Sequence, residues 1–161
     1  MTIVVGDSIP KGNLVRMRED GPEAFDVTEF FQNKRVVLFS VPGAFTATCS
    51  NKHLPGYVSN ATAIKQKQID VVACLAVNDI HVMHAWGESL GAINDVIMLA
   101  DGNCSYTEAL GMVLDLSAAN MGRRCKRFSA VIDDGVITML NLEPPREFGV
   151  SSAEAMLEQL S

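Results

Sequence analysis

The chain has 161 residues, of which 48% are hydrophobic and 20% charged, so it has the size and composition of one globular domain with a substantial core. Its 13 basic and 19 acidic residues give a net charge of −6, which argues against nucleic acid or an anionic membrane as a partner. No apolar stretch is long enough to cross a bilayer. We therefore expect a single domain over residues 1–161.

Four cysteines lie at positions 49, 74, 104 and 125 and contain no C-x-x-C pair, so neither a zinc ribbon nor a thioredoxin-type dithiol is expected. A disulfide framework is typical of smaller secreted chains, so these cysteines fit a reducing compartment and a cytoplasmic protein. The first residues show neither a signal peptide nor a transit pattern, although a presequence removed earlier would leave no trace. We assign no metal and no organic cofactor.

A strand–helix–strand unit is predicted in the first half of the chain. Residues 36–41 form a fully apolar run that is typical of a strand covered on both faces, and residues 69–77 form a second. Between them, apolar residues keep helical spacing from Thr48 onward. Pro55 removes an amide donor from this helix, so it should kink the helix and leave the first turn loosely attached. Two parallel strands joined by a helix are the expected result.

The remaining elements alternate helices and strands. In chain order they are a helix over 80–90, a strand over 96–100, a short helix over 106–110, and a hairpin of strands 128–132 and 136–140. Asn78 and Asp79 can cap the first of these helices, and Gly111 ends the second. Ser151 and Glu154 form a capping box for a last helix. This order predicts an α/β fold of the thioredoxin-like type, with a central mixed sheet flanked by helices and an N-terminal extension.

Cys49 is the candidate catalytic residue, because it follows the first strand and a Pro-Gly turn and opens the first helix. Sites in open α/β sheets form beyond the carboxyl ends of strands. The first turn of a helix stabilises a thiolate through its free amides and dipole. Thr46 lies three residues earlier, close enough for its hydroxyl to reach the sulfur, and it can also cap the helix. The alternative is a buried, inert thiol.

Other candidates are weaker. Arg127 ends a basic cluster over 123–127 that otherwise reads as a solvated loop; at the start of a strand near Cys49, its guanidinium would favour a thiolate and hold an oxygen acceptor. His53 shares a helix face with Cys49, which fits packing or a supporting role better than catalysis. His81 and His84 have no partner ligands for a metal. Cys104 and Cys125 receive no role.

Cys74 lies in the middle of the second strand, so the default prediction is a thiol buried in the core. Its strand neighbours the one that leads to Cys49, so a disulfide between the two becomes reachable if the first helical turn unwinds. Both readings stay open.

Residues 41–56, VPGAFTATCSNKHLPG, closely resemble the P-G-A-F-T-P-x-C-S-x-x-H-L-P-G signature of type II, peroxiredoxin-5-like peroxiredoxins. The resemblance extends to VVACLAVND at 71–79, to Trp86-Gly87 and to KRFS at 126–129. It covers nearly the whole chain. It implies a thioredoxin-fold thiol peroxidase that reduces hydrogen peroxide and alkyl hydroperoxides.

By this resemblance, Cys49 matches the peroxidatic cysteine, Thr46 the threonine that orients the peroxide, and Arg127 the arginine that activates thiol and peroxide. Pro42 matches the proline that opens the active-site loop. The sulfenic acid of Cys49 would be recycled by Cys74 as a disulfide, or by glutathione, glutaredoxin or thioredoxin. The resemblance also implies a homodimer with its contact near the active-site loops.

Two departures from the family pattern concern the loop and the second cysteine. Ala47 replaces the family's proline, which would fix φ and shield the pocket. The resolving cysteine that animal members carry near the C-terminus has no counterpart in residues 144–152, whereas Cys74 follows Cys49 by the 25 residues typical of plant-like members.

The alternative function is a thiol-based redox sensor or chaperone that uses the same reactive cysteine. A thioredoxin-type oxidoreductase is disfavoured by the missing C-x-x-C pair. A cysteine hydrolase is disfavoured because no histidine with an orienting carboxylate or amide is evident in the sequence.

Overall fold

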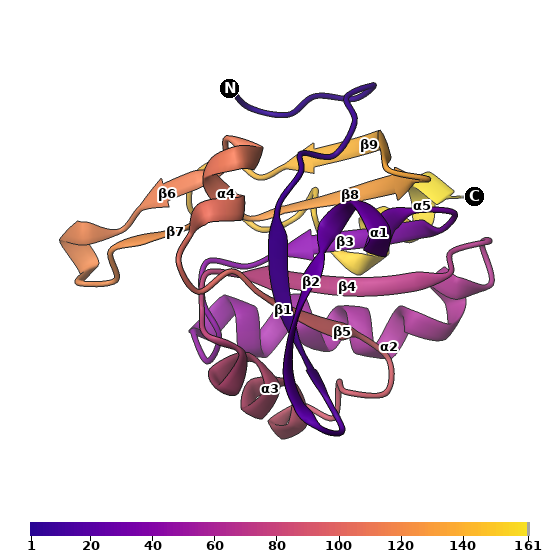
Figure 1. The fold of residues 1–161 in the computed structure, drawn as a ribbon. Helices are drawn as coiled ribbons and strands as arrows, with labels where there is room; N and C mark the ends of the chain where they lie inside the picture. The colour runs from indigo at the N-terminus through magenta and orange to yellow at the C-terminus, as the bar shows by residue number, and fades with distance from the viewer. Residues whose placement is uncertain (161) are drawn as a thin grey trace.

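A seven-stranded mixed sheet runs through the computed structural model, which describes residues 1–160 (Figure 1). Its strands lie in the order β2-β1-β5-β4-β3-β8-β9. They are β1 (Asn13–Arg18), β2 (Gly21–Asp26), β3 (Arg35–Ser40), β4 (Val71–Ala76), β5 (Ile97–Ala100), β8 (Phe128–Asp133) and β9 (Val136–Leu142). A separate antiparallel pair, β6 (Val113–Asp115) and β7 (Arg123–Cys125), projects from the body at one end.

The parallel centre of the sheet is β3, β4 and β5. The predicted strand–helix–strand unit is confirmed, because α2 (Leu54–Lys65) connects β3 to the parallel strand β4. Both strands are buried along almost their whole length, as expected for an apolar run covered on two faces. Strand β8 pairs antiparallel with β3, and β9 pairs with β8 as the predicted hairpin.

Helices cover both faces of the sheet. On one face, the core includes residues of α2, α3 (Ile80–Ser89) and α5 (Ala153–Leu160), with Tyr57, Trp86 and Met156 fully buried. On the other face, the core includes Phe31 of α1 (Val27–Phe31) and Leu110 of α4 (Ser105–Leu110). The expected mixed sheet with flanking helices is therefore confirmed.

Pro55 affects the helix in a more specific way than a simple kink. Residues Cys49–His53 form a π-helical turn directly before α2, in which the Leu54 amide donates to the carbonyl of Cys49. Proline has no amide hydrogen, so the ladder cannot continue in the α pattern through this point. A wide turn just before the proline accommodates the missing donor. Cys49 thus begins a π turn rather than a regular first turn.

The predicted ends of α3 and α4 are confirmed, and the predicted start of α5 is corrected. Asp79 caps α3 by accepting from the Val82 amide, and Gly111 ends α4 with a φ of 69°. The proposed capping box at Ser151 is wrong by one residue. Ser152 precedes α5 and accepts from the Ala155 amide, because the Ser151 hydroxyl is occupied by a buried bond to Glu143.

The N-terminal region contains structure that the sequence reading left as an extension. Strands β1 and β2 form an antiparallel hairpin that joins the sheet at β5, and Asp26 caps α1 by accepting from Thr28. The basic cluster is also more ordered than a solvated loop, because Arg123–Cys125 is strand β7. Arg123 pairs with Glu108, and Arg124 donates to the Met121 and Val77 carbonyls.

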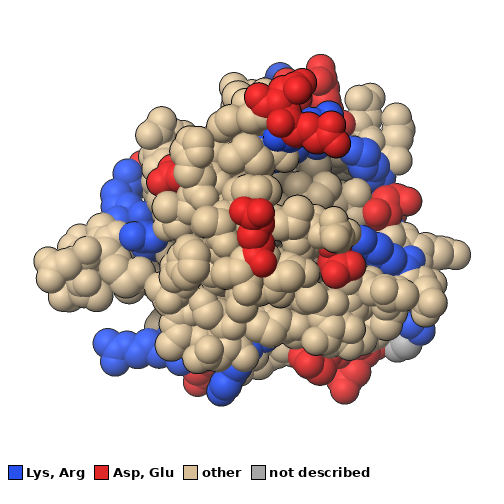
Figure 2. Space-filling view, turned by 90° about the horizontal axis from the view of Figure 1, so that it is seen from below, with Lys and Arg blue, Asp and Glu red and all other residues tan. Residues whose placement is uncertain are grey.

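The face seen from below carries scattered basic and acidic side chains with wide uncharged surface between them (Figure 2). Among the described residues, no helix has both the length and the hydropathy needed to cross a membrane.

Candidate active site

Cys49 and Arg127 meet at the carboxyl end of β3. Arg127 Nη2 donates to Cys49 Sγ at 3.1 Å. The contact follows from the sheet register, because Ser40, the last residue of β3, is paired with Phe128, the first residue of β8. The buried Ser40 hydroxyl donates to the Lys126 carbonyl at 2.6 Å and accepts from the Phe128 amide at 3.1 Å. Ser40 therefore holds both neighbours of Arg127 against the end of β3.

The Cys49 side chain has no exposed surface in this state. It begins the π turn, and its carbonyl accepts from Leu54. The next residue, Ser50, accepts a hydrogen bond from the indole nitrogen of the buried Trp86 at 2.9 Å. The thiol is thus enclosed, with the Arg127 guanidinium as its charged neighbour.

The loop before Cys49 is fixed at several points. Thr46 Oγ1 donates to the Gly43 carbonyl at 2.7 Å, so its single hydrogen is not directed at Cys49. The Thr46 carbonyl accepts from Ser50, and this bond begins the helix. Asn78, just after β4, accepts from the Ala44 amide at 3.0 Å. The lone pairs of the Thr46 hydroxyl therefore remain available to accept a hydrogen bond. The predicted helix cap by this hydroxyl is not observed, and the Thr46 carbonyl makes the first contact of the helix instead.

His53 takes part in the site through both ring nitrogens. Nε2 lies 3.0 Å from the Ser151 carbonyl, and Nδ1 lies 2.7 Å from Arg127 Nη1. A carbonyl can only accept and a guanidinium can only donate, so Nε2 carries the proton and Nδ1 accepts. Burial, assisted by the positive charge of Arg127, lowers the pKa of His53 to about 3. His53 is therefore a neutral imidazole with a single defined tautomer.

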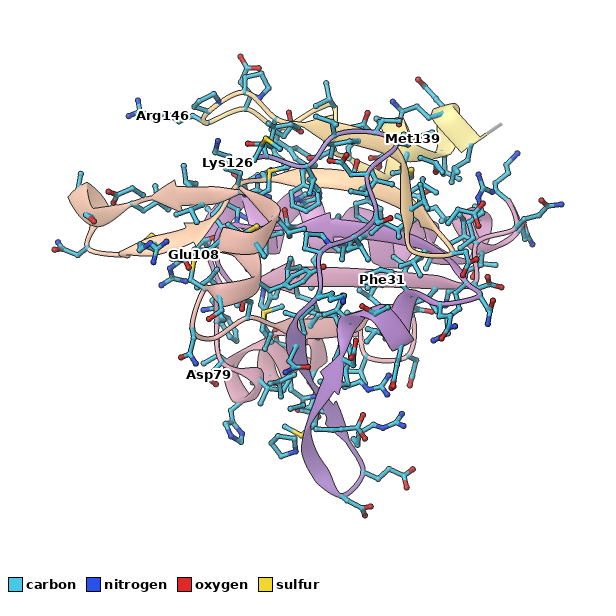
Figure 3. The ribbon with its side chains drawn as sticks, turned by 45° about the horizontal axis from the view of Figure 1, so that its top comes forward. Phe31, Asp79, Glu108, Lys126, Met139 and Arg146 are labelled. Carbon is cyan, nitrogen blue, oxygen red and sulfur yellow. The ribbon has the colours of Figure 1, made fainter. Side chains whose placement is uncertain are left out.

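A cavity of about 670 Å³ opens beside Arg127. It is lined by Pro42, Thr48, Leu114, Asp115, Leu116, Lys126, Arg127, Leu142, Glu143, Pro144, Pro145, Arg146, Glu147 and Phe148. Lys126 and Arg146, which both belong to this lining, lie at the same end of the molecule (Figure 3). The cavity combines apolar walls with basic and acidic groups, and it gives a route from solvent to the neighbourhood of Arg127.

The other three cysteines are buried free thiols. Cys74 lies on β4, within the core cluster that also contains Cys49. Burial raises the pKa of Cys74 well above its ordinary value, with a smaller contribution from Cys49. Burial also raises the pKa of Cys104, and that of Cys125 to about 12. These three thiols are therefore neutral at physiological pH.

The structure brings together three of the predicted site residues directly or through a shared cavity. Cys49 contacts Arg127, and Pro42 lines the cavity beside Arg127. Thr46 belongs to the loop that leads to Cys49, and Cys74 lies on the neighbouring strand. Among residues 1–160, no group of three or more His, Cys, Asp or Glu side chains is arranged to hold a metal ion.

Sequence reasoning missed the residues that support the site. They are Ser40, Asn78, Glu143 and Ser151. Each has a common polar side chain in a strand end or loop. Ser40, Asn78 and Ser151 contact positions that lie 34 to 98 residues away in sequence, and Glu143 contacts the Arg127 carbonyl and the loop that contains Ser151. Strand pairing and the packing of the loop after β9 bring these residues to the site, and local spacing along the chain encodes neither.

Comparisons with known proteins agree with this arrangement. The Redoxin family model matches residues 4–157. The chain is 47% identical over 164 residues to peroxiredoxin-2E-2, chloroplastic, of Oryza sativa subsp. japonica, covering 99% of this chain and 73% of the relative. It is 42% identical over 159 residues to peroxiredoxin-2B of Arabidopsis thaliana, covering 98% of each.

Solved structures show the same fold. Reduced Prx3 of Vibrio vulnificus in complex with H₂O₂ superposes with a TM-score of 0.96 at 45% identity, covering 99% of this chain and 100% of that chain. Peroxiredoxin 5 of Alvinella pompejana gives a TM-score of 0.86 at 34% identity, covering 98% and 97%. The thioredoxin-like fold is thereby confirmed. The chain belongs to the peroxiredoxins of the Redoxin family, which are thiol-dependent peroxidases.

Proposed function

We propose that Cys49 is the peroxidatic cysteine of this peroxidase and that Thr46, Arg127 and Pro42 assist it. The observation that carries this assignment is the 3.1 Å hydrogen bond from Arg127 Nη2 to Cys49 Sγ. A guanidinium at this distance stabilises the thiolate, and its remaining donors can bind a peroxide oxygen. Pro42 lines the cavity, and the peroxide approaches through this cavity.

The chemical step is a nucleophilic displacement on oxygen. The Cys49 thiolate attacks the terminal oxygen of hydrogen peroxide or an alkyl hydroperoxide, so that an S–O bond forms while the O–O bond breaks. The electron pair of the broken bond leaves on the other oxygen, which takes a proton from water and departs as water or alcohol. The sulfur is oxidised to a sulfenic acid and the peroxide is reduced.

The polar groups act on the charge that moves during this step. Arg127 stabilises the charge developing on the leaving oxygen, while the lone pairs of the Thr46 hydroxyl accept the peroxide hydrogen and orient the molecule. Because Cys49 is fully buried, residues 44–48 must shift locally to admit the peroxide. Phe45 in this segment has a φ of 65°, an uncommon conformation for a bulky residue and a sign of local strain.

The sulfenic acid of Cys49 must be reduced by thiols before the next cycle. Attack of a thiol on the sulfenic acid forms a disulfide and releases water, and a second thiol then reduces the disulfide. The attacking thiol is Cys74, or an external one from glutathione, glutaredoxin or thioredoxin. Cys74 shares a core cluster with Cys49, which supports the internal route, but its burial and raised pKa oppose it until the π turn unwinds.

The internal route has a direct test. Peptide mapping by mass spectrometry after one equivalent of peroxide should show a link between Cys49 and Cys74. A Cys74→Ser variant should then lose turnover with thioredoxin while keeping its first oxidation step. Full turnover of Cys74→Ser with every reductant would leave Cys74 as a core residue only.

Assembly, compartment and domain organisation are part of the same proposal. We infer a homodimer, because Phe45 is 57% exposed at the edge of the active-site loop and an exposed aromatic ring is a frequent interface anchor. Sedimentation velocity of the reduced protein tests this, and a monomer at micromolar concentration would contradict it. Four free thiols fit a cytoplasmic location, and one sheet with a core on each face supports a single domain over 1–161.

The central assignment is tested by Cys49→Ser. This variant should lose peroxidase turnover while its circular dichroism and melting temperature stay close to those of the parent protein. Turnover retained by a folded Cys49→Ser variant would remove the assigned role. The rate constant of Cys49 oxidation by peroxide in the parent protein also separates the two functions, because a peroxidase needs rapid oxidation, whereas slow oxidation would favour a redox sensor or chaperone.

A further inference from the structure

Arg127 is held by a closed set of hydrogen bonds that runs through residues far from Cys49. The Arg127 carbonyl accepts from the Glu143 amide at 3.0 Å, next to the last pair of the β8–β9 ladder. At its other end, Arg127 Nη1 donates to His53 Nδ1. Glu143 and His53 are in turn connected through Ser151. The Arg127 backbone is therefore fixed by Glu143 and its guanidinium by His53, and Ser151 joins these two contacts into one ring.

Glu143 orders the loop that contains Ser151. It is 8% exposed, and its Oε2 accepts from the Gly149 amide at 2.6 Å, the Ser151 amide at 2.9 Å and the Ser151 hydroxyl at 2.7 Å. Burial by itself would raise the pKa of Glu143, but these hydrogen bonds outweigh it and lower the pKa. The carboxylate therefore stays charged and ties the loop after β9 onto itself.

Ser151 passes this constraint to His53. Its carbonyl accepts from His53 Nε2 and from the Tyr57 hydroxyl, at 3.0 Å and 2.9 Å. That contact keeps the proton on Nε2, so Nδ1 remains an acceptor for Arg127. Phe148, in the same loop, packs with its ring centroid 5.0 Å from that of His53 and 5.8 Å from Arg127 Cζ. The loop thus holds both the tautomer of His53 and the plane of the guanidinium.

We propose that Glu143 and His53 are positioning residues of the peroxidase: the buried carboxylate orders the loop whose Ser151 carbonyl fixes His53, and His53 holds Arg127 so that Nη2 faces Cys49. This inference rests on the proposed role of Arg127. Neither residue touches the peroxide. Their effect is to remove the orientational freedom of the guanidinium, which would otherwise sample geometries in which it does not contact the sulfur.

A matched pair of His53 variants tests the contact with the Arg127 guanidinium. Leucine and asparagine have nearly the same shape, but only asparagine places an acceptor where Nδ1 lies. His53→Leu should lower the rate constant of Cys49 oxidation by about 10- to 100-fold. His53→Asn should restore a large part of that loss. His81→Leu, an exposed histidine on α3, is the control and should react at the parent rate.

Glu143→Gln tests the carboxylate that orders the loop after β9. Its control is Glu154→Gln, which replaces an exposed carboxylate in the first turn of α5. Glu143→Gln should slow Cys49 oxidation by about 10-fold and shift the pH dependence of Cys49 alkylation by iodoacetamide to higher pH. Glu154→Gln should change neither. Melting temperatures are measured alongside, because a structural role alone would lower stability without moving the alkylation profile of the folded protein.

Arg127→Met separates failure of this inference from failure of the residue assignment. If Arg127→Met is slow while folded Glu143→Gln or His53→Leu reacts at the parent rate, the positioning proposal is wrong. Equal rates for His53→Leu and His53→Asn, both below the parent rate, would also overturn it. If Arg127→Met itself reacts at the parent rate, the role of Arg127 fails instead. Should Glu143→Gln not fold, the His53 pair alone decides.

Discussion

Arg127 Nη2 lies 3.1 Å from Cys49 Sγ although 78 residues separate the two in sequence. The antiparallel pairing of β3 with β8 produces this contact, since it places the start of β8 at the end of β3. The loop that leads to Cys49 follows the same strand end, so one register fixes the positions of both Cys49 and Arg127. A slip of one residue would turn the side chains of β8 to the opposite face of the sheet.

Replacing Arg127 by lysine should show that geometry matters as much as charge. Arg127→Lys keeps the positive charge but loses the planar fork that contacts Cys49 and His53 together. We expect the rate constant of Cys49 oxidation to fall by about 100-fold, which corresponds to about 3 kcal/mol. Stopped-flow measurements should find the rate unchanged for Arg123→Lys, which lies at the exposed first position of β7. A parent-like rate for Arg127→Lys would mean that charge alone suffices.

Restoring the proline at position 47 should stabilise the active-site loop. Ala47 is the first helical residue after Thr46, the position at which proline is well tolerated and its fixed φ suits a helix. Ala47→Pro should raise the free energy of unfolding by about 0.4–1 kcal/mol and speed Cys49 oxidation. Urea denaturation and stopped-flow kinetics measure the two effects, and a destabilised variant would show that the backbone at Ala47 is incompatible with proline.

Trp86 should report the state of the π turn. It is the only tryptophan, it is fully buried, and its indole nitrogen donates to Ser50 beside Cys49. A disulfide with Cys74 requires this turn to unwind, which breaks the indole contact and admits water. The emission of the oxidised protein should therefore shift to longer wavelength and return on reduction. An unchanged spectrum in protein shown by mass spectrometry to carry the disulfide would contradict this coupling.

Stability should fall with acidification because of His53. Its pKa is 6.5 as an ordinary histidine and about 3 when buried beside Arg127, so the unfolded chain binds the extra proton first. Its contribution is fully present above pH 6.5 and is lost as pH falls from there toward about 3. The slope for one group is about 1.4 kcal/mol per pH unit.

Glu143, with its lowered pKa, adds a second loss only below its ordinary value of 4.5. His53→Asn should therefore flatten the stability profile between pH 6.5 and 4.5 while leaving the more acidic decline. Urea titrations of both proteins across this range measure the difference. Parallel profiles would show that His53 is not the group that titrates.

Local patterns in the sequence were sufficient for the elements that carry Cys49. The apolar run of strand length and the helical spacing after Thr48 depend only on neighbouring residues, and both elements are present in the structure. The turn between them spans residues 43–46, where the Thr46 amide donates to the Gly43 carbonyl, rather than the Pro-Gly pair itself. The family signature in residues 41–56 added the thiol peroxidase chemistry. The short strands β6 and β7 and the N-terminal hairpin were missed, because their apolar residues are few and their stability comes from pairing with other strands.

The sequence by itself identified Cys49 as the candidate reactive residue, because a cysteine at a strand-to-helix junction is a local arrangement. Only the tertiary structure decided what surrounds that sulfur. The contacts of Arg127 with Cys49, His53 and Glu143 join segments that the chain order keeps far apart. Strand register and the packing of the loop after β9 bring them together. Hydrogen bonds of this kind depend on distance and direction in space, which no spacing along the chain encodes.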